Sequence, residues 1–229
     1  MNDIFFLLIN GITVACIYGL VAVAVSITWS ALGLLNLSYG FIFSFAGYGA
    51  WLAERHLWGE PIFVLFMGIA AGILGGVIVC LLIFIPVHDK PNFTLRGMIG
   101  TIAVSLIGGQ VLLQFFGPKA KLLPEFFGYS KIKILDVVIT ADKIGIIFSS
   151  IIMLTLVVKW MKSSRRGLEI RAMMMNPHAA AIVGIGVRKT GLYVMAVTGA
   201  MTGLSAVLLS QTYYLSPFSG LTPMIKGVS

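Results

Sequence analysis

The chain contains few charged residues. Only 10% of its 229 residues are Asp, Glu, Lys or Arg, whereas 59% are hydrophobic. A soluble domain carries roughly a quarter charged residues because its surface must be hydrated. The mean hydropathy of +1.01 therefore excludes an ordinary soluble domain and predicts a surface that faces lipid.

Charge is absent from one long N-terminal run, which extends from Ile4 to Ala53. A helix crosses the bilayer with about 20 residues, so this run holds two spans. Apolar stretches along the whole chain predict spans at 5–28, 34–53, 62–86, 97–117, 144–161 and 191–212. Such long unbroken runs exclude the strands of a membrane barrel. We expect an all-α integral membrane protein: a polytopic helical bundle with about six transmembrane helices, forming one domain over residues 1–229.

The N-terminus and the cysteines add two exclusions. No Lys or Arg precedes the first apolar run, so the chain lacks the basic region of a secretory signal and the first span is expected to be retained. Cys16 and Cys80 both lie inside apolar runs, which is typical of small buried hydrophobic residues and not of a disulfide.

Catalytic patterns are also absent. The three histidines are far apart in the sequence, and there is no HExxH, GxSxG, metal-spaced Cys/His cluster or GxxxxGK[ST] phosphate loop. We expect no catalytic residue, no metal and no cofactor in this chain. The basic residues gather in one loop between apolar segments, so the net charge of +8 is interpreted as a topology signal and not as nucleic-acid binding.

The central parts of the six predicted spans contain no Asp, Glu, Lys or Arg. Carriers that are coupled to protons or sodium usually keep an ionisable group within the bilayer. The sequence thus disfavours an ion-coupled carrier and indicates that the energy for any transport comes from outside this chain.

The loop at residues 159–190 gives the orientation. Its basic residues outnumber its one acid, Glu169, by seven to one: Lys159, Lys162, Arg165, Arg166, Arg171, Arg188 and Lys189. Basic loops remain in the cytoplasm, so alternation places 54–60 outside, 88–96 inside, 119–143 outside and the N-terminus outside. The 119–143 segment is the weakest fit, because it carries five lysines.

Glycines recur at intervals of four in two predicted spans, at Gly68, Gly72 and Gly76 and at Gly199 and Gly203. Small residues at this spacing let helix backbones approach closely. Glycine is also simply frequent in membrane helices, and the sequence leaves both interpretations open.

A polar segment at membrane depth is formed by Asn36, Leu37, Ser38, Tyr39 and Gly40. Polar groups and glycine can interrupt a helix and leave backbone groups that line a cavity. This segment is our candidate for the substrate pathway. The alternative is a short polar hairpin in which Asn36 and Ser38 are helix caps.

The capping pattern of residues 171–184 predicts a short helix in the basic loop. Asn176 suits the N-cap, Pro177 suits the first helical position and Gly184 suits the end. A helix of about two turns is marginal in water, so a partner protein is its natural cover. Folding back onto the bundle or the lipid surface is the alternative.

These residues resemble a known family, the permeases of ABC importers for branched-chain amino acids and related amides. The opening helix from Asn10-Gly11 to Ala22 resembles that family's first helix, and the 36–40 segment resembles its usual Asn-Phe-Ala-His-Gly. The loop at 163–189 resembles its cytoplasmic loop, through Arg166-Gly167, Arg171-Ala172, Asn176, Ala180-Ala181 and Gly184-Ile185. Ser38 and Tyr39 depart from the usual Ala and His, which leaves the solute open.

The resemblance implies a coupling element that docks on a separate ATPase and contains Gly167, Arg171, Ala172, Asn176, Pro177, Ala180 and Gly184. It further implies a permease subunit of a bacterial inner membrane with no ATPase site of its own. The partners that the resemblance implies are two cytosolic ATPase subunits that bind the ATP, a second permease subunit, identical or different, and an external solute-binding protein.

Two alternatives to the importer subunit stay open at this point. One is an ion-coupled carrier or passive channel. The other is a non-transporting remnant, because the family continues beyond Met224 with further spans, so that about two helices are expected to be missing after Ser229.

Overall fold

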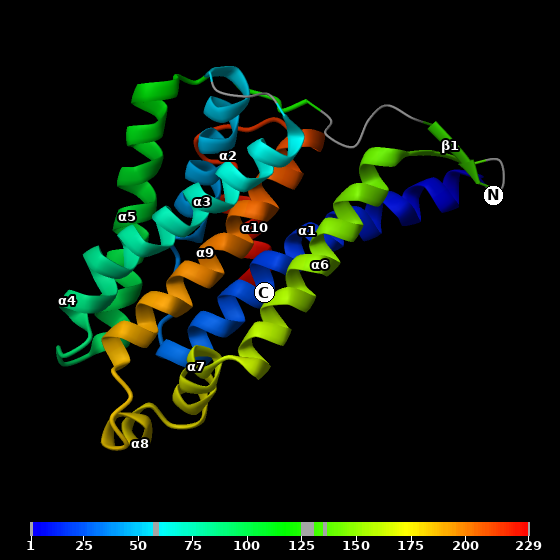
Figure 1. Ribbon diagram of the computed structural model, residues 1–229. Helices are drawn as coiled ribbons and strands as arrows, with labels where there is room; N and C mark the ends of the chain where they lie inside the picture. The colour runs from blue at the N-terminus through cyan, green and yellow to red at the C-terminus, as the bar shows by residue number, and fades with distance from the viewer. Residues whose placement is uncertain (1, 57–59, 125–130, 135–136, 229) are drawn as a thin grey trace.

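The computed structural model describes residues 2–56, 60–124, 131–134 and 137–228, which are mainly helical (Figure 1). The helices are α1 (Asn2–Leu32), α2 (Tyr39–His56), α3 (Pro61–Val79), the π-helix η1 (Cys80–Phe84), α4 (Ile85–Val87), α5 (Phe93–Phe116), α6 (Ala141–Ser163), α7 (Arg165–Met175), α8 (Pro177–Ile182), α9 (Val187–Thr212) and α10 (Leu221–Val228). Two short strands, β1 (Lys131–Ile134) and β2 (Val137–Thr140), form an antiparallel pair with Ile132 opposite Ile139.

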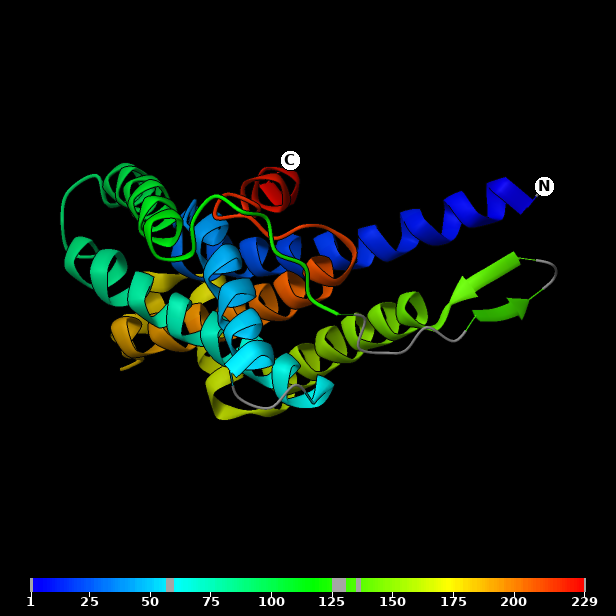
Figure 2. The ribbon, with the colours of Figure 1, turned by 90° about the horizontal axis from the view of Figure 1, so that it is seen from above.

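Helix α9 forms the centre of the bundle. Its most extensive contacts are with α3, α1 and α2, and every residue from Thr198 to Gln211 is buried. Helix α5 packs on α2 and helix α6 packs on α1, so these two helices lie at the periphery (Figure 2). The hydrophobic core thus lies where α1, α2, α3 and α9 meet.

The prediction of a polytopic helical bundle is confirmed. Among the described residues, five helical segments are long and apolar enough to cross a membrane: 7–32, 61–87, 93–116, 141–163 and 187–212. Helix α2 is the sixth, and it ends with Glu54, Arg55 and His56. The predicted start of that second span is wrong, because residues 34–38 are not helical.

The glycines of α3 and α9 face one another, so of the two interpretations of their spacing the structure shows the close approach of helix backbones. A Cβ atom on Gly72 would lie 2.3 Å from the carbonyl oxygen of Gly199, and one on Gly76 would lie 2.2 Å from that of Met195. A Cβ on Gly203 would likewise meet the carbonyl oxygen of Gly68 at 2.5 Å. We call these five glycines, Gly68, Gly72, Gly76, Gly199 and Gly203, the glycine seam. Only residues without a side chain permit this backbone contact.

Two sets of contacts define the two sides of the bundle. Arg188, next to the start of α9, forms an ion pair with Asp89, so the 88–96 loop lies on the same side as α7 and α8. On the other side, backbone hydrogen bonds of 2.9 and 2.7 Å join Lys121 to Leu215. The N-terminus lies far from α7 and α8 (Figure 1). This arrangement matches the predicted alternation, although parts of the 54–60 and 119–143 segments fall outside the described residues.

The π-helix within the second half of the third span has a local cause. Pro86 has no backbone N–H, so one carbonyl in the preceding turn loses its usual donor. The backbone widens there, and the N–H of Ile85 donates to the carbonyl of Cys80, five residues back. The sequence signal, a proline near the end of an apolar run, was present but does not distinguish a kink from this single wide turn.

Candidate translocation and coupling sites

The chain breaks between α1 and α2 at the polar segment. Gly33 has a φ of +62°, which ends α1 in the left-handed conformation that glycine adopts without strain. The side-chain oxygen Oδ1 of Asn36 accepts hydrogen bonds from the N–H of Ser38, at 3.0 Å, and from its hydroxyl, at 2.5 Å. Asn36 therefore forms a local turn that starts α2, which is the geometry expected of a cap.

The hydroxyl of Tyr39 anchors this turn to two other helices. Its oxygen lies 2.5 Å from Oγ1 of Thr28 and 3.2 Å from the carbonyl oxygen of Ala24. Thr28 in turn donates to Oγ1 of Thr198 on α9, at 3.4 Å. A chain of hydroxyl groups thus connects α1, α2 and α9 at the centre of the bundle.

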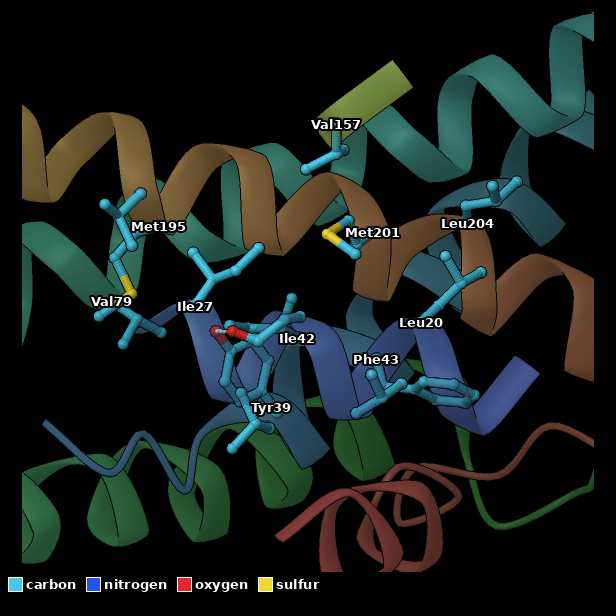
Figure 3. Close-up of a cluster of buried hydrophobic side chains, with 14 of the residues drawn as sticks. Leu20, Ile27, Tyr39, Ile42, Phe43, Val79, Val157, Met195, Met201 and Leu204 are labelled. Carbon is cyan, nitrogen blue, oxygen red and sulfur yellow. Dashed lines mark hydrogen bonds between the residues drawn. The ribbon is translucent and has the colours of Figure 1, made fainter. Parts of the chain in front are cut away.

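Two further contacts complete the network. Oγ1 of Thr101 on α5 accepts a hydrogen bond from the N–H of Leu37, at 3.1 Å, and the side-chain NH₂ of Asn36 lies 3.6 Å from the sulfur of Met195. Asn36, Ser38 and Tyr39 are fully buried, and Figure 3 shows Tyr39 among core side chains close to α9. In this conformation these polar groups are paired with one another and closed to solvent.

Gly40 has a different environment, on the face of α2 that the C-terminal part of the chain covers. A Cβ on Gly220, just before α10, would lie 2.1 Å from the carbonyl oxygen of Gly40. The N–H of Gly220 also donates to the hydroxyl of Ser44, at 3.3 Å. Gly40 thus allows the loop before α10 to pass directly over α2.

The structure adds Thr28, Thr101 and Thr198 to the residues that the sequence selected. Each lies in a largely apolar helix that carries other hydroxyl residues, such as Ser30, Ser105 and Thr202, and each comes from a different helix. Their only sequence signal is a polar side chain at membrane depth. Because a lone threonine often bonds to its own helix backbone, the sequence could not show that these three converge on residues 36–39.

The basic loop begins with a tight turn between α6 and α7. The hydroxyl of Ser164 accepts from the N–H of Gly167, at 2.9 Å, and so caps α7. A Cβ on Gly167 would lie 2.3 Å from the carbonyl oxygen of Met161. Arg171 reaches back to donate to the carbonyl of Lys162, at 3.3 Å. Gly167 and Arg171 therefore fix the angle at which α7 leaves the membrane span.

Glu169 connects this turn to the start of α9. It pairs with Arg166 at 3.0 Å and accepts a hydrogen bond of 3.4 Å from Thr190. The hydrogen bond that Arg166 donates to Glu169, together with the negative charge of Glu169, raises the pKa of Arg166. Ala172 packs against the hydrophobic core from α7. The loop is thus held to the bundle at its base.

Helix α8 has the predicted caps. Oδ1 of Asn176 accepts from the N–H of Ala179, at 3.1 Å, and Pro177 occupies the first turn. Gly184 has a φ of +88°, and the N–H of Ile185 donates to the carbonyl of buried Ala180, at 3.0 Å. These contacts close the short helix at both ends.

The tip of this loop exposes large apolar side chains. Met175 is 90% exposed, Ile182 is 86% exposed and Val183 is 77% exposed. Neither the bundle nor a described neighbouring segment covers them. These three side chains therefore do not fold back onto the bundle, which was the alternative for α8.

The two groups of candidate residues lie in different parts of the molecule. Asn36, Ser38, Tyr39 and Gly40 belong to the bundle, whereas the coupling candidates lie on α7 and α8 at its end (Figure 1). In the part of the chain that the structure describes, no three His, Cys, Asp or Glu side chains lie close enough to hold a metal ion.

A bundle of about six membrane helices with a capped, protruding basic loop defines a polytopic membrane protein. The family model described as "branched-chain amino acid transport system / permease component" matches residues 7–227, and the chain belongs to this family. It is a multi-pass permease subunit of an ABC importer in the cytoplasmic membrane, and as such it works with ATPase and solute-binding partners.

Similar proteins span most of the chain at low identity. The high-affinity branched-chain amino acid transport system permease protein LivH of Escherichia coli (strain K12) is 23% identical over 231 residues, which cover 95% of this chain and 74% of LivH. BraD of Pseudomonas aeruginosa is also 23% identical and covers 96% of this chain and 75% of BraD. A probable LivH of Methanocaldococcus jannaschii is 31% identical over 131 residues, 54% of this chain and 40% of that protein. No solved structure matches the chain.

Proposed function

We propose that this permease subunit carries branched-chain amino acids or related polar solutes across the cytoplasmic membrane, past Asn36, Ser38, Tyr39 and Gly40. The support is the convergence of four helices on this one polar segment. In the present conformation its groups are paired with each other, and a passage would open when α1, α2 and α9 separate there. The solute class rests on the names of the similar proteins, LivH and BraD.

The second part of the proposal is that α7 and α8 couple this movement to ATP hydrolysis in a partner. Gly167, Arg171, Ala172, Asn176, Pro177, Ala180 and Gly184 would shape the coupling element, and Met175, Ile182 and Val183 would enter a groove of the ATPase. The observation that carries this part is the exposed apolar tip on a helix that is capped at both ends. Such a surface favours a protein partner over water.

The chain itself would bind no ATP and no cofactor. Its sequence has no phosphate-binding loop, so the nucleotide would be bound by two cytosolic ATPase subunits. A second permease subunit, identical or different, and an external solute-binding protein would complete the importer. The basic side of the loop is suited to a charged cytosolic partner.

Co-purification with the ATPase subunits of the same transport system tests the coupling proposal. Ile182→Glu places a charge on the apolar tip without touching the bundle, so we expect retained ATPase to fall at least tenfold. A charge introduced into a buried interface costs about 1.4 kcal/mol or more, which is a factor of ten in binding. Tyr214→Glu is the matched control, because Tyr214 is also largely exposed, at 71%, and precedes Leu215 on the other side of the bundle.

The proposal requires that both variants have the same unfolding midpoint as the wild type. Equal ATPase recovery with Ile182→Glu and with Tyr214→Glu would show that α8 is not the docking element.

A further inference from the structure

An apolar groove lies between α6 and the core of the bundle. Its volume is about 310 Å³, and all the side chains that line it are apolar. Val157 and Trp160 of α6 form one wall, Ile73 of α3 contributes to the other, and Ala196 and Ala200 of α9 form the floor. The volume lies at the low end of the range of about 300–1,000 Å³ for ligand pockets.

The groove exists because α6 packs mainly on α1 and α7 and only lightly on α9. The alanines of α9 have side chains too short to fill the remaining gap. Leu156, at the edge of the groove, is 57% exposed on a helix that crosses the membrane. A groove that opens toward lipid would be filled by hydrocarbon, since an unfilled one loses dispersion contacts on every wall.

Aromatic and polar side chains follow the groove toward the cytoplasm, and we call them the rim. Tyr193 lies one helical turn before Val197 of the groove, and Lys189 lies one turn further toward the cytoplasm on the same face of α9. The guanidinium of Arg166 lies 4.8 Å from the centre of the Tyr193 ring. Trp160 and Tyr193 are the aromatic types that favour the level of the lipid headgroups.

The net charge at this rim is positive. Three basic residues, Arg166, Arg188 and Lys189, line one cavity with two acids, Asp89 and Glu169. Because Glu169 pairs with Arg166 and Asp89 pairs with Arg188, exposed Lys189 carries the excess positive charge. From Lys143 to Leu168 the sequence of α6 and the turn after it contains no Asp or Glu at all. The cytoplasmic leaflet carries a negative surface potential from anionic lipids, which attracts basic residues at this depth.

We propose that this groove binds an anionic phospholipid of the cytoplasmic leaflet, with one acyl chain between α6 and α9 and the headgroup at Arg166 and Lys189. A second copy of the chain would bring a second basic rim toward the first if it docked here about a two-fold axis, which like-charge repulsion disfavours. The lipid would hold the lightly packed α6 against α9. The proposal does not depend on which solute the protein carries.

Fluorescence quenching by brominated lipids tests the site directly. The other three tryptophans are replaced by Trp29→Phe, Trp51→Phe and Trp58→Phe, so that Trp160 is the only tryptophan. The protein is placed in phosphatidylcholine bilayers with increasing fractions of brominated phosphatidylglycerol or brominated phosphatidylcholine. We expect brominated phosphatidylglycerol to reach half-maximal quenching at a mole fraction roughly five times lower, or less, than brominated phosphatidylcholine needs. A roughly fivefold preference is the effect of about one basic residue.

Two pairs of variants separate the headgroup from the acyl chain. Arg166→Gln with Lys189→Gln should remove the preference for the anionic lipid, whereas Lys119→Gln, on the other side of the bundle, should leave it unchanged. Ala196→Phe should reduce quenching by both lipids because its ring fills the groove. Ala103→Phe, on the exposed face of α5, is its control.

Equal quenching by the two lipids would mean that Trp160 meets ordinary surrounding lipid, and the proposal would fail. Absence of quenching by either lipid would mean that protein covers the groove, which also contradicts it. If the triple substitution unfolds the chain, a photoactivatable phosphatidylglycerol on the wild type should label residues 153–160 and 193–200. Labelling confined to other helices would overturn the proposal.

Discussion

The glycine seam and the coupling arm, residues 164–186, are built on opposite principles. In the seam, α3 and α9 touch through their backbones, and the structure has no space for even one methyl group. In the arm, each helix is closed by its own caps at Ser164, Asn176 and Gly184, and its apolar tip remains uncovered. The seam is therefore fixed by contacts between distant segments. The arm is held to the bundle at its base by Glu169 and Ala172, but helix α8 at its end is closed by contacts within a few residues.

This difference fits the separate tasks of the two regions. A rigid pair of central helices can move as one unit, while a preformed arm can receive a partner without first having to fold. The hydroxyl network at Tyr39 shares one property with each region. It joins distant helices, but through hydrogen bonds that can exchange partners.

The largest effect is expected in the seam. Gly72→Ala places a methyl group 2.3 Å from the carbonyl oxygen of Gly199. Neither backbone can yield easily, so the free energy of unfolding should fall by about 3 kcal/mol, the upper part of the usual range for overpacking. Unfolding in mixed detergent measures it.

Gly19→Ala on α1 is the control for this prediction, because no heavy atom lies within 4 Å of its added Cβ. It should be neutral or slightly stabilising. Equal losses for the two variants would show that the seam is not a close contact.

A smaller effect is expected in the hydroxyl network. Tyr39→Phe removes the hydroxyl that lies 2.5 Å from Oγ1 of Thr28. Hydrogen bonds between membrane helices contribute about 0.6 kcal/mol on average and up to about 1.7. A double-mutant cycle with Thr28→Val should give a coupling energy in this range. Additive losses would mean that the two hydroxyls do not interact.

In the arm, Asn176→Ala should act locally. Loss of the N-cap costs about 1 kcal/mol of helix stability, so hydrogen exchange at residues 177–183 should accelerate while the unfolding midpoint of the bundle stays constant. Asn176→Asp, which can still accept the hydrogen bond from Ala179, should restore protection. A fall in the midpoint of the whole bundle would contradict the separation of the two regions.

The smallest effect concerns His88, at the cytoplasmic end of the third span. Burial lowers the pKa of His88, and Arg188 and His178 lower it further, although Asp89 opposes them. As the pH falls below about 6.5, His88 binds a proton in the unfolded chain before it does so in the folded protein. The free energy of unfolding therefore decreases as the pH falls below that value. His88→Gln should flatten this part of the pH profile of the unfolding midpoint, and an unchanged slope would contradict the assignment.

The sequence predicts most of the fold because a long apolar run can satisfy its backbone hydrogen bonds in lipid only as a helix. It also predicts α8, whose caps are local: Asn176, Pro177 and Gly184 specify the helix without any distant contact. Close approach of helices at Gly72 and Gly199 was one of two interpretations of the glycine spacing, and the sequence did not show that these two helices would be partners.

What the sequence did not predict depends on distant or competing contacts. The second span was placed too early because Leu34 and Leu35 are apolar, and the turn that Asn36 forms excludes them from the helix. The short strands β1 and β2 lie in a segment with a mixed pattern, and α7 was not separated from its loop. The convergence of Thr28, Thr101 and Thr198 requires the packing of α1, α5 and α9, which no local pattern contains.

ATP-dependent uptake tests the central claim most directly. The chain is reconstituted in proteoliposomes with its partner permease, ATPases and solute-binding protein, and the uptake of labelled leucine, isoleucine and valine is measured with and without ATP. We predict uptake that requires ATP, that Ile182→Glu abolishes and that Tyr214→Glu preserves. Uptake that persists without ATP, or that is indifferent to Ile182→Glu, would contradict a permease driven through α8 and would favour a passive channel or an ion-coupled carrier.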